Sequence, residues 1–584
     1  MALTGGTAEA QLAVPDVASQ DPRVLVPSDS AAEPAIVLPP PNVDNSRQNN
    51  NLPSMPTPVA VGDLGIVEGP VAGTLNDFNG GLGQDMWAGS NRSDVEMLLR
   101  RAPTTLMSQT SRLLFRKVLL TEAPLPVGLG TQPFNALRIQ LLLDAGELSD
   151  AGALAARIRS RDAQTQRMQA DAMLYAGRDI EVCGEATSER LQSAEPFWVS
   201  LRAYCYHFDG DTLALELTRS VMEQQGIADA AFFHLLDAFD VEEQTPPDVI
   251  ASPNAIHVRL LLRHDLPIPL NAVSSLGMPV SVITAMLPDM AIEMRRPVAE
   301  QVFRSGVLPA SVMADVFDAT EFASGDLNLS TTIARSEPMM AALERIHHAL
   351  KIDGRADRRA ELVHLAFLIG RNEGLLAQIA ELFADDAAAI YPAPNWEAWS
   401  PLMMRGLILA ERDSAADRWY AMLNPQIPAH LNAARDTTFL LSIVRREQPY
   451  ITDAQGPLAD IALQSLNLGV PLTDLARNTI ILGLFDVLGL DMPPEARSQA
   501  QQLVTMGFPG RSPPPFILQR IENASLTGKK GELGLAILDA LGPRGAKDMA
   551  PNVIVFFVRA LRTAGMIESA QALANEAIFT WQDG

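Results

Sequence analysis

The two cysteines are the residues whose spacing most directly predicts a covalent link in this chain. Cys183 and Cys205 lie 22 residues apart and are the only cysteines among 584 residues. Two helices of one hairpin can bring residues at this separation face to face, so a disulfide is geometrically allowed. A disulfide would indicate an exported protein. The alternative interpretation is a pair of small buried hydrophobic residues in a reducing compartment.

Histidine spacing does not favour a metal site. His347 and His348 are adjacent, so on a helix they point about 100° apart and cannot hold one ion as residues four apart can. His257 and His264 are seven residues apart, which is two helical turns, and no third ligand accompanies them. We expect structural roles for these histidines and no bound metal.

Motifs for nucleotide binding and for common hydrolases do not occur in the sequence. The segment 526–534 contains Gly-Lys-Lys-Gly, but Asn523 stands where a phosphate-binding loop requires glycine. The G-x-S-x-G nucleophile motif and the H-E-x-x-H zinc motif are absent. We therefore expect no cofactor and no recognisable catalytic residue. A catalytic pair of carboxylates in a cleft stays possible, because a sequence with 69 acidic residues neither excludes nor locates one.

Two groups of aromatic residues are candidates for partner binding. Aromatic side chains are enriched where protein partners meet, because they bury a large area at small entropic cost. The alternative is that tryptophan fills space between packed helices. The candidate partner-binding aromatics are Trp198, Tyr206, Trp396, Trp399, Trp419 and Tyr420.

Helical hairpins are the elements that must position these side chains. Gly146, Gly177 and Gly210 recur at separations of 31 and 33 residues, and each follows an apolar helical stretch. A recurrence of this length is typical of stacked helix-turn-helix units. Ser93 is predicted to cap the first helix, with Glu96 three residues on completing a capping box.

Composition agrees with closely packed helices and excludes some partners. The chain is 47% hydrophobic but only 5% aromatic, and it carries a formal charge of −24. That balance opposes nonspecific nucleic-acid binding, which requires a basic surface. No segment is long and apolar enough to cross a bilayer, so we expect no direct membrane insertion.

The first 90 residues differ from the rest. They are rich in Pro, Gly, Asn and Ser and lack an amphipathic period, which predicts a disordered arm. Within this range Met86 and Trp87 form an apolar pair that is expected to dock onto the first helices. The first 20 residues contain no basic stretch and no continuous apolar run of a secretory signal, which favours a cytoplasmic protein. The cysteine pair favours export instead, and both localisations stay open.

The helical units resemble tetratricopeptide-type and Sel1-type hairpins in length and in the small residues at helix crossings. The resemblance covers residues 93–584, although no unit combines the Trp, Leu-Gly, Tyr, Ala and Pro positions of that consensus. It implies a scaffold or peptide-binding role and transfers no catalytic residue. We expect an all-α fold, an α-solenoid in two arcs, with domains at 1–90, 91–325 and 326–584.

The function predicted from these observations is a noncatalytic scaffold that binds a protein or peptide partner, in the bacterial cell envelope. One alternative is an enzyme with a carboxylate-based site inside a helical toroid, acting on polysaccharide or peptidoglycan. A second alternative is a structural subunit of an envelope or motility assembly. The sequence does not indicate an oligomeric state.

Overall fold

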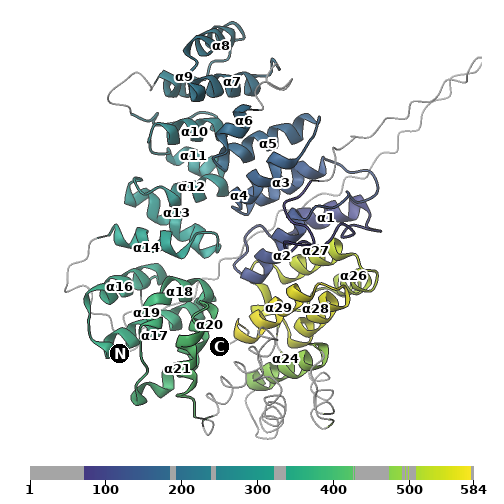
Figure 1. Ribbon diagram of the computed structural model, residues 1–584, viewed down its shortest axis with the longest axis vertical. Helices are drawn as coiled ribbons and strands as arrows, with labels where there is room; N and C mark the ends of the chain where they lie inside the picture. The colour runs from purple at the N-terminus through teal and green to yellow at the C-terminus, as the bar shows by residue number, and fades with distance from the viewer. Residues whose placement is uncertain are drawn as a thin grey trace, which may run out of the picture. The chain divides into compact units, whose positions relative to one another are not determined.

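The computed structural model describes residues 72–184, 193–237, 245–320, 337–424, 472–488 and 510–580, and the single residues 427, 494, 498 and 508. Within these ranges it contains 25 α-helices and no β-strand (Figure 1). The expectation of an all-α fold is therefore confirmed for the part of the chain that is described. The predicted arm up to residue 71 and the predicted domain boundary at 325 lie outside it.

The first group of helices precedes residue 320, and its members are mostly short. The bounds are α1 Arg92–Arg101, α2 Gln109–Leu120, α3 Phe134–Asp144, α4 Leu148–Arg157, α5 Ala163–Tyr175, α6 Asp179–Gly184, α7 Pro196–Asp209, α8 Thr212–Gln224, α9 Ala230–Asp237, α10 Ala255–Arg263, α11 Leu270–Leu276, α12 Met278–Met286, α13 Ile292–Arg304 and α14 Ala310–Asp318.

The second group follows residue 337. Its α-helices are α16 Met339–Ile352, α17 Ala356–Glu373, α18 Leu376–Leu382, α19 Ala384–Ala388, α20 Ser400–Leu409, α21 Asp413–Tyr420, α24 Leu472–Leu488, α26 Pro515–Leu526, α27 Lys530–Leu541, α28 Pro551–Thr563 and α29 Ile567–Thr580. Two 3₁₀ helices, η5 Pro394–Trp399 and η6 Gly545–Asp548, lie among them. None of the described helices is long and apolar enough to span a membrane.

The recurrent glycines end helices as their spacing predicts. Gly146, Gly177 and Gly210 have φ values of +79°, +70° and +75° and follow α3, α5 and α7. A residue with a Cβ is strained in this left-handed conformation, so glycine is favoured where one helix ends and the next begins at once. After Gly210, the Asp211 carboxylate accepts a hydrogen bond from the Ala214 amide and starts α8.

The predicted capping box at the first helix is wrong. The N-cap of α1 is Asn91, whose side chain accepts from the Ser93 amide. Glu96 is buried instead, with its carboxylate 2.6 Å from Arg92 Nε and also accepting from the Thr131 amide. Asparagine is a strong N-cap, and a nearby arginine competes for the glutamate that a capping box needs.

The first and last described helices share one hydrophobic core. One cluster of buried apolar side chains draws on residues 72–290 and 476–578, and a second draws on residues 282–419. Helix α2 packs against both α27 and α29, and α1 packs against α27. In a strictly linear array each unit contacts only its sequence neighbours. These contacts between distant helices differ from that expectation.

Residues 72–90, the N-terminal strap, pack against the helices although the sequence assigned them to the arm. The Thr74 amide donates to the Leu120 carbonyl at 2.8 Å, and the Gly531 amide donates to the Met86 carbonyl at 2.9 Å. Trp87 is 5% exposed and meets the ring of Phe134 edge-on, with ring centroids 5.8 Å apart. The predicted docking of Met86 and Trp87 is thus observed, and it involves α27 as well as an early helix.

Candidate binding site

A cavity of about 290 Å³ lies between α3, α5 and the junction of α11 with α12. It is formed by segments that are far apart in the sequence, and four of its ten lining residues have polar side chains. The lining residues are Gln140, Leu143, Asp144, Met168, Asp171, Tyr175, Leu276, Gly277, Met278 and Pro279.

Two aspartates from neighbouring helices line this cavity. Asp144 is the last residue of α3 and is solvent-exposed, whereas Asp171 lies in the middle of α5 with a side chain only 17% exposed. Desolvation by the surrounding protein raises the pKa of both carboxyl groups. A hydrogen bond from Gln140 Nε2 to Asp144 Oδ1, 3.0 Å long, partly offsets the rise in the pKa of Asp144.

Asp171 is held from one side only. Arg167, one helical turn earlier, donates from Nε to Asp171 Oδ2 at 2.8 Å, which partly offsets the raised pKa of Asp171. The other oxygen, Oδ1, is buried and has no hydrogen-bond partner within the described part of the chain. A buried acceptor without a donor costs about 1–3 kcal/mol. Tyr175, one turn further along α5, also lines the cavity, and burial raises the pKa of its hydroxyl.

Sequence reasoning did not single out these residues. Asp144 stands two positions before Gly146, at the end of an apolar helical stretch. The feature of the sequence that could have indicated this site is Asp171, because it interrupts an apolar run that includes Ala170, Ala172 and Met173. An acidic residue on a helix face that is otherwise buried indicates either a specific partner or a binding site.

The predicted tryptophan group does converge, but mainly into the core. Trp396 stacks on Trp399 with ring centroids 6.0 Å apart and on Trp419 at 6.5 Å. Trp396 is 7% exposed and Trp419 is fully buried, so neither ring is free to touch a partner. Trp399 is half-buried and stacks on His364, whereas Tyr420 is 42% exposed. Of this group, Tyr420 is exposed and Trp399 is partly exposed.

The second aromatic group divides in the same way. Trp198 is 7% exposed and packs edge-on against Phe197, with ring centroids 5.0 Å apart. Tyr206 is half-buried on α7. The guanidinium carbon of Arg167 lies 3.3 Å from the ring centroid of Phe197. Because Arg167 also pairs with Asp171, this contact connects the aromatic group with the cavity.

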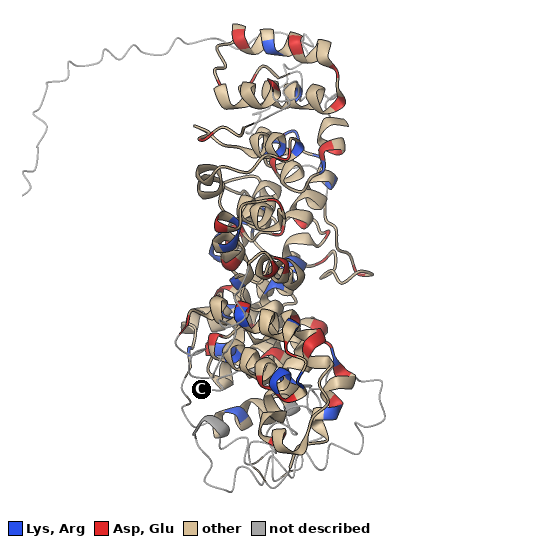
Figure 2. Ribbon diagram, turned by 90° about the vertical axis from the view of Figure 1, so that its left-hand side faces the viewer, with Lys and Arg blue, Asp and Glu red and all other residues tan. Residues whose placement is uncertain are grey.

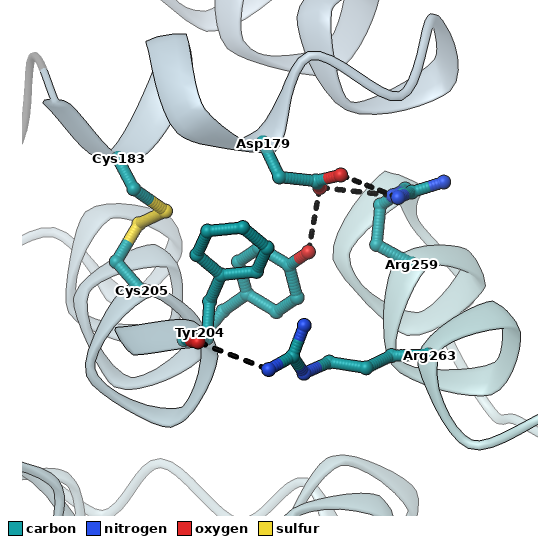
Figure 3. Close-up of a disulfide and its surroundings, with 7 residues drawn as sticks. Asp179, Cys183, Tyr204, Cys205, Arg259 and Arg263 are labelled. Atoms are coloured by element: carbon teal, nitrogen blue, oxygen red, sulfur yellow. Dashed lines mark hydrogen bonds and ion pairs between the residues drawn. A yellow bond between two sulfur atoms is a disulfide. The ribbon is translucent and has the colours of Figure 1, made fainter. Parts of the chain in front are cut away.

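The cysteines are joined in the structure, close to a buried ion pair (Figure 3). A disulfide connects Cys183 on α6 with Cys205 on α7, and their Cα atoms are 5.3 Å apart. Beside it, the Asp179 carboxylate accepts from Tyr204 Oη at 2.6 Å and from Arg259 Nε at 2.9 Å. This arrangement ties α6, α7 and α10 together.

Protein isolated with its thiols blocked at lysis is expected to contain no free thiol, and to yield two after reduction. Reduction should lower the free energy of unfolding by about 3 kcal/mol, because the bond closes a loop of 22 residues in the unfolded chain. The measurement is thiol titration with urea unfolding in the presence and absence of reductant. A Cys183→Ser, Cys205→Ser double variant is the control and should not respond to reductant. Two free thiols in the unreduced native protein would contradict the prediction.

Several histidines lie close to other titratable side chains. Nε2 of His207 lies 3.2 Å from Nε2 of His264, and His257 Nε2 lies 3.2 Å from Asp229 Oδ2. Burial, together with the neighbouring His264 and Arg263, lowers the pKa of His207 to about 4. No group of three or more His, Cys, Asp or Glu side chains suited to a metal ion occurs in the described segments.

Acidification is expected to destabilise the fold between pH 6.5 and about 4. The pKa of His207 falls from 6.5 to about 4 in the fold, and burial and Arg371 lower the pKa of His364 likewise to about 4. The unfolded chain therefore binds more protons in this window, so stability is lost as the pH falls through it. Urea unfolding at several pH values should show a shallower slope for His207→Gln and His364→Gln. The exposed His234→Gln is the control, and equal slopes for all three variants would refute the assignment.

Charge is spread along the helices. Basic and acidic segments are interspersed on the described helices in Figure 2, consistent with a chain of 45 basic and 69 acidic residues. The cavity is therefore distinguished by its local composition, and not by a large charged face.

Comparison of the chain with protein-family models, with curated proteins and with solved structures finds no match in any of the three.

Proposed function

We propose that this protein is a noncatalytic helical-repeat scaffold that binds a protein or peptide partner. In this proposal the described helices belong to an α-solenoid in two arcs, preceded by the N-terminal arm. Packing of consecutive helices supports the repeat part of the proposal, since α4 packs on α5, α7 on α8, α12 on α13 and α20 on α21. Helix α5 also packs against α3 and α10, as stacked hairpins would.

The cavity between α3, α5 and the α11–α12 junction is the single observation that carries the binding role. It collects side chains from three parts of the chain and keeps a buried carboxylate oxygen without a donor. A folded protein seldom leaves such a group unpaired unless something else satisfies it.

We further propose that the protein is exported, in the periplasm of a bacterial envelope. The Cys183–Cys205 disulfide supports this, because such bonds persist in oxidising compartments and are rare in the cytosol. The cytoplasmic alternative predicts two reduced thiols in the cell. A structural subunit of an envelope or motility assembly would differ from the scaffold in its stoichiometry.

A carboxylate-based enzyme is the second candidate, and the same cavity favours it. A glycoside hydrolase needs one carboxyl group with a raised pKa as general acid and a second carboxylate nearby. Asp144 and Asp171 line one cavity, and desolvation by the surrounding protein raises the pKa of each. Asp144, however, is exposed at the turn that ends α3. A side chain at such a position is equally suited to contact a macromolecular partner.

The decisive experiment isolates the tagged full-length protein from its natural host after mild crosslinking and determines complex composition by native mass spectrometry. The scaffold predicts one defined partner at a fixed ratio and no release of sugar from peptidoglycan or polysaccharide. A chain that elutes alone and releases sugar, with release abolished in Asp144→Asn, would establish the enzyme instead. A truncation that tests the arm should remove residues 1–71, because residues 72–90 belong to the packed fold.

A further inference from the structure

The polar lining of the cavity is rich in hydrogen-bond acceptors. Asp144 and Asp171 contribute carboxylate oxygens, and Gln140 has already directed its amide group to Asp144 Oδ1, which leaves its carbonyl oxygen as an acceptor. The Tyr175 hydroxyl and the second amide N–H of Gln140 are the side-chain donors in this lining. A ligand that matches this lining must therefore bring several donors and few acceptors.

The cavity also has a negative charge that its own residues do not neutralise. None of its ten described lining residues is Lys or Arg. Arg167, behind the cavity, pairs with Asp171 Oδ2 at 2.8 Å and is fixed against Phe197, with 3.3 Å between its guanidinium carbon and the ring centroid. Arg167 pairs with Asp171, whereas Asp144 has no ion-pair partner among the described residues, so the charge of Asp144 is left for a cation to balance.

The apolar lining defines the rest of the ligand. Hydrophobic side chains from four helices surround the acceptors: Leu143, Met168, Leu276, Met278 and Pro279. Such walls suit a short methylene chain and leave a carbohydrate ring, with its many hydroxyl groups, poorly matched. A volume of about 290 Å³ is at the lower end of the range for small-molecule pockets and fits one long side chain.

We infer that this cavity binds the primary ammonium group of a lysine side chain presented by the protein partner. Lysine has a four-carbon apolar stem and an ammonium with three donors and no acceptor, which matches both parts of the lining. The inference rests on the proposed scaffold function and adds to it a recognised residue. A free aliphatic amine has the same chemistry, and the experiment must separate the two sources.

The test measures binding to the full-length protein by isothermal titration calorimetry. The probes are an acetylated and amidated Gly-Gly-Lys-Gly-Gly peptide, its norleucine counterpart, pentylammonium and pentanoate. The lysine peptide is expected to bind at least about tenfold more tightly than the norleucine peptide, and pentanoate is expected not to bind. Tighter binding of pentylammonium than of the lysine peptide would assign the cavity to a free amine and overturn the lysine proposal.

Variants of the two aspartates locate the effect. Asp144→Asn is expected to weaken lysine-peptide binding about tenfold, and Asp171→Asn to weaken it by at least as much. Asp315→Asn, an exposed position on α14, removes the same charge elsewhere and should change affinity by less than about twofold. Circular dichroism establishes that each variant is folded.

Two outcomes would overturn the inference. One is equal binding of the lysine and norleucine peptides to the unaltered protein, and the other is unchanged affinity in both Asp144→Asn and Asp171→Asn. Failure here remains distinguishable from failure of the proposed function. A chain that co-purifies with a defined partner but ignores the lysine peptide remains a scaffold with a different recognition surface.

Discussion

Replacing Asp179 with alanine is expected to lower the free energy of unfolding by about 3–5 kcal/mol. The Asp179 side chain is only 7% exposed and accepts hydrogen bonds from Tyr204 Oη and from both Nε and Nη2 of Arg259. Without the carboxylate, the guanidinium of Arg259 stays largely buried with its charge unpaired, and the Tyr204 hydroxyl loses its acceptor. Urea unfolding followed by circular dichroism measures the loss.

Three further variants make that prediction specific. Tyr204→Phe removes one hydrogen bond and should cost about 1 kcal/mol. The double variant Asp179→Ala, Arg259→Met should recover part of the loss, because no buried charge remains unpaired. Asp237→Ala breaks a surface pair with Arg219 in which the aspartate is 56% exposed, and should cost less than about 1 kcal/mol. If Asp179→Ala and Asp237→Ala are equally stable, the buried pair does not stabilise the fold as argued.

Trp87→Ala is the second substitution for which we expect a large loss, about 3–5 kcal/mol. The indole is 5% exposed, contacts Phe134, and covers Gly531 so closely that a Cβ there would lie 2.4 Å from a ring carbon. Removing the ring leaves a cavity between the strap, α3 and α27. The change in free energy is again measured by urea unfolding.

Phe78→Ala is the matched control for Trp87, because Phe78 lies in the same strap and is 98% exposed. It should change stability by less than about 0.5 kcal/mol. Gly531→Ala should destabilise the native protein because the added methyl group meets the indole, but should be tolerated once Trp87 is alanine. Additive effects of Trp87→Ala and Gly531→Ala would contradict this contact.

Local features of the fold could be predicted from the sequence because they depend on neighbouring residues. Helix ends at Gly146, Gly177 and Gly210 follow from backbone sterics, and the cap at Asp211 follows from the capacity of its carboxylate to accept from a free amide of the first turn. Even a local prediction can fail when neighbouring residues compete for the same role. The N-cap of α1 is Asn91, and not Ser93 as the sequence predicted.

Contacts between distant segments could not be predicted in the same way. Asp179 and Arg259 are 80 residues apart, and each alone has the pattern of an ordinary charged residue on a helix. The cavity needs α3, α5 and the α11–α12 junction together, and no periodicity encodes which helices meet. Trp396, Trp399 and Trp419 lie close together in the fold, but which of their rings is buried depends on the helices that cover them.

The N-terminal strap has a consequence for how this protein is made. Ser90 Oγ donates to Glu532 Oε2 across 442 residues, and Ser108 Oγ donates to Glu576 across 468. At a synthesis rate of 5–20 residues per second, roughly 20–90 s pass between the emergence of Trp87 from the ribosome and that of the helix it covers. During that interval α27 is not yet available for Met86 and Trp87 to pack against. The strap is therefore synthesised early but is among the last segments to pack onto the fold. A chain that crosses a membrane unfolded and folds afterwards would meet no such delay.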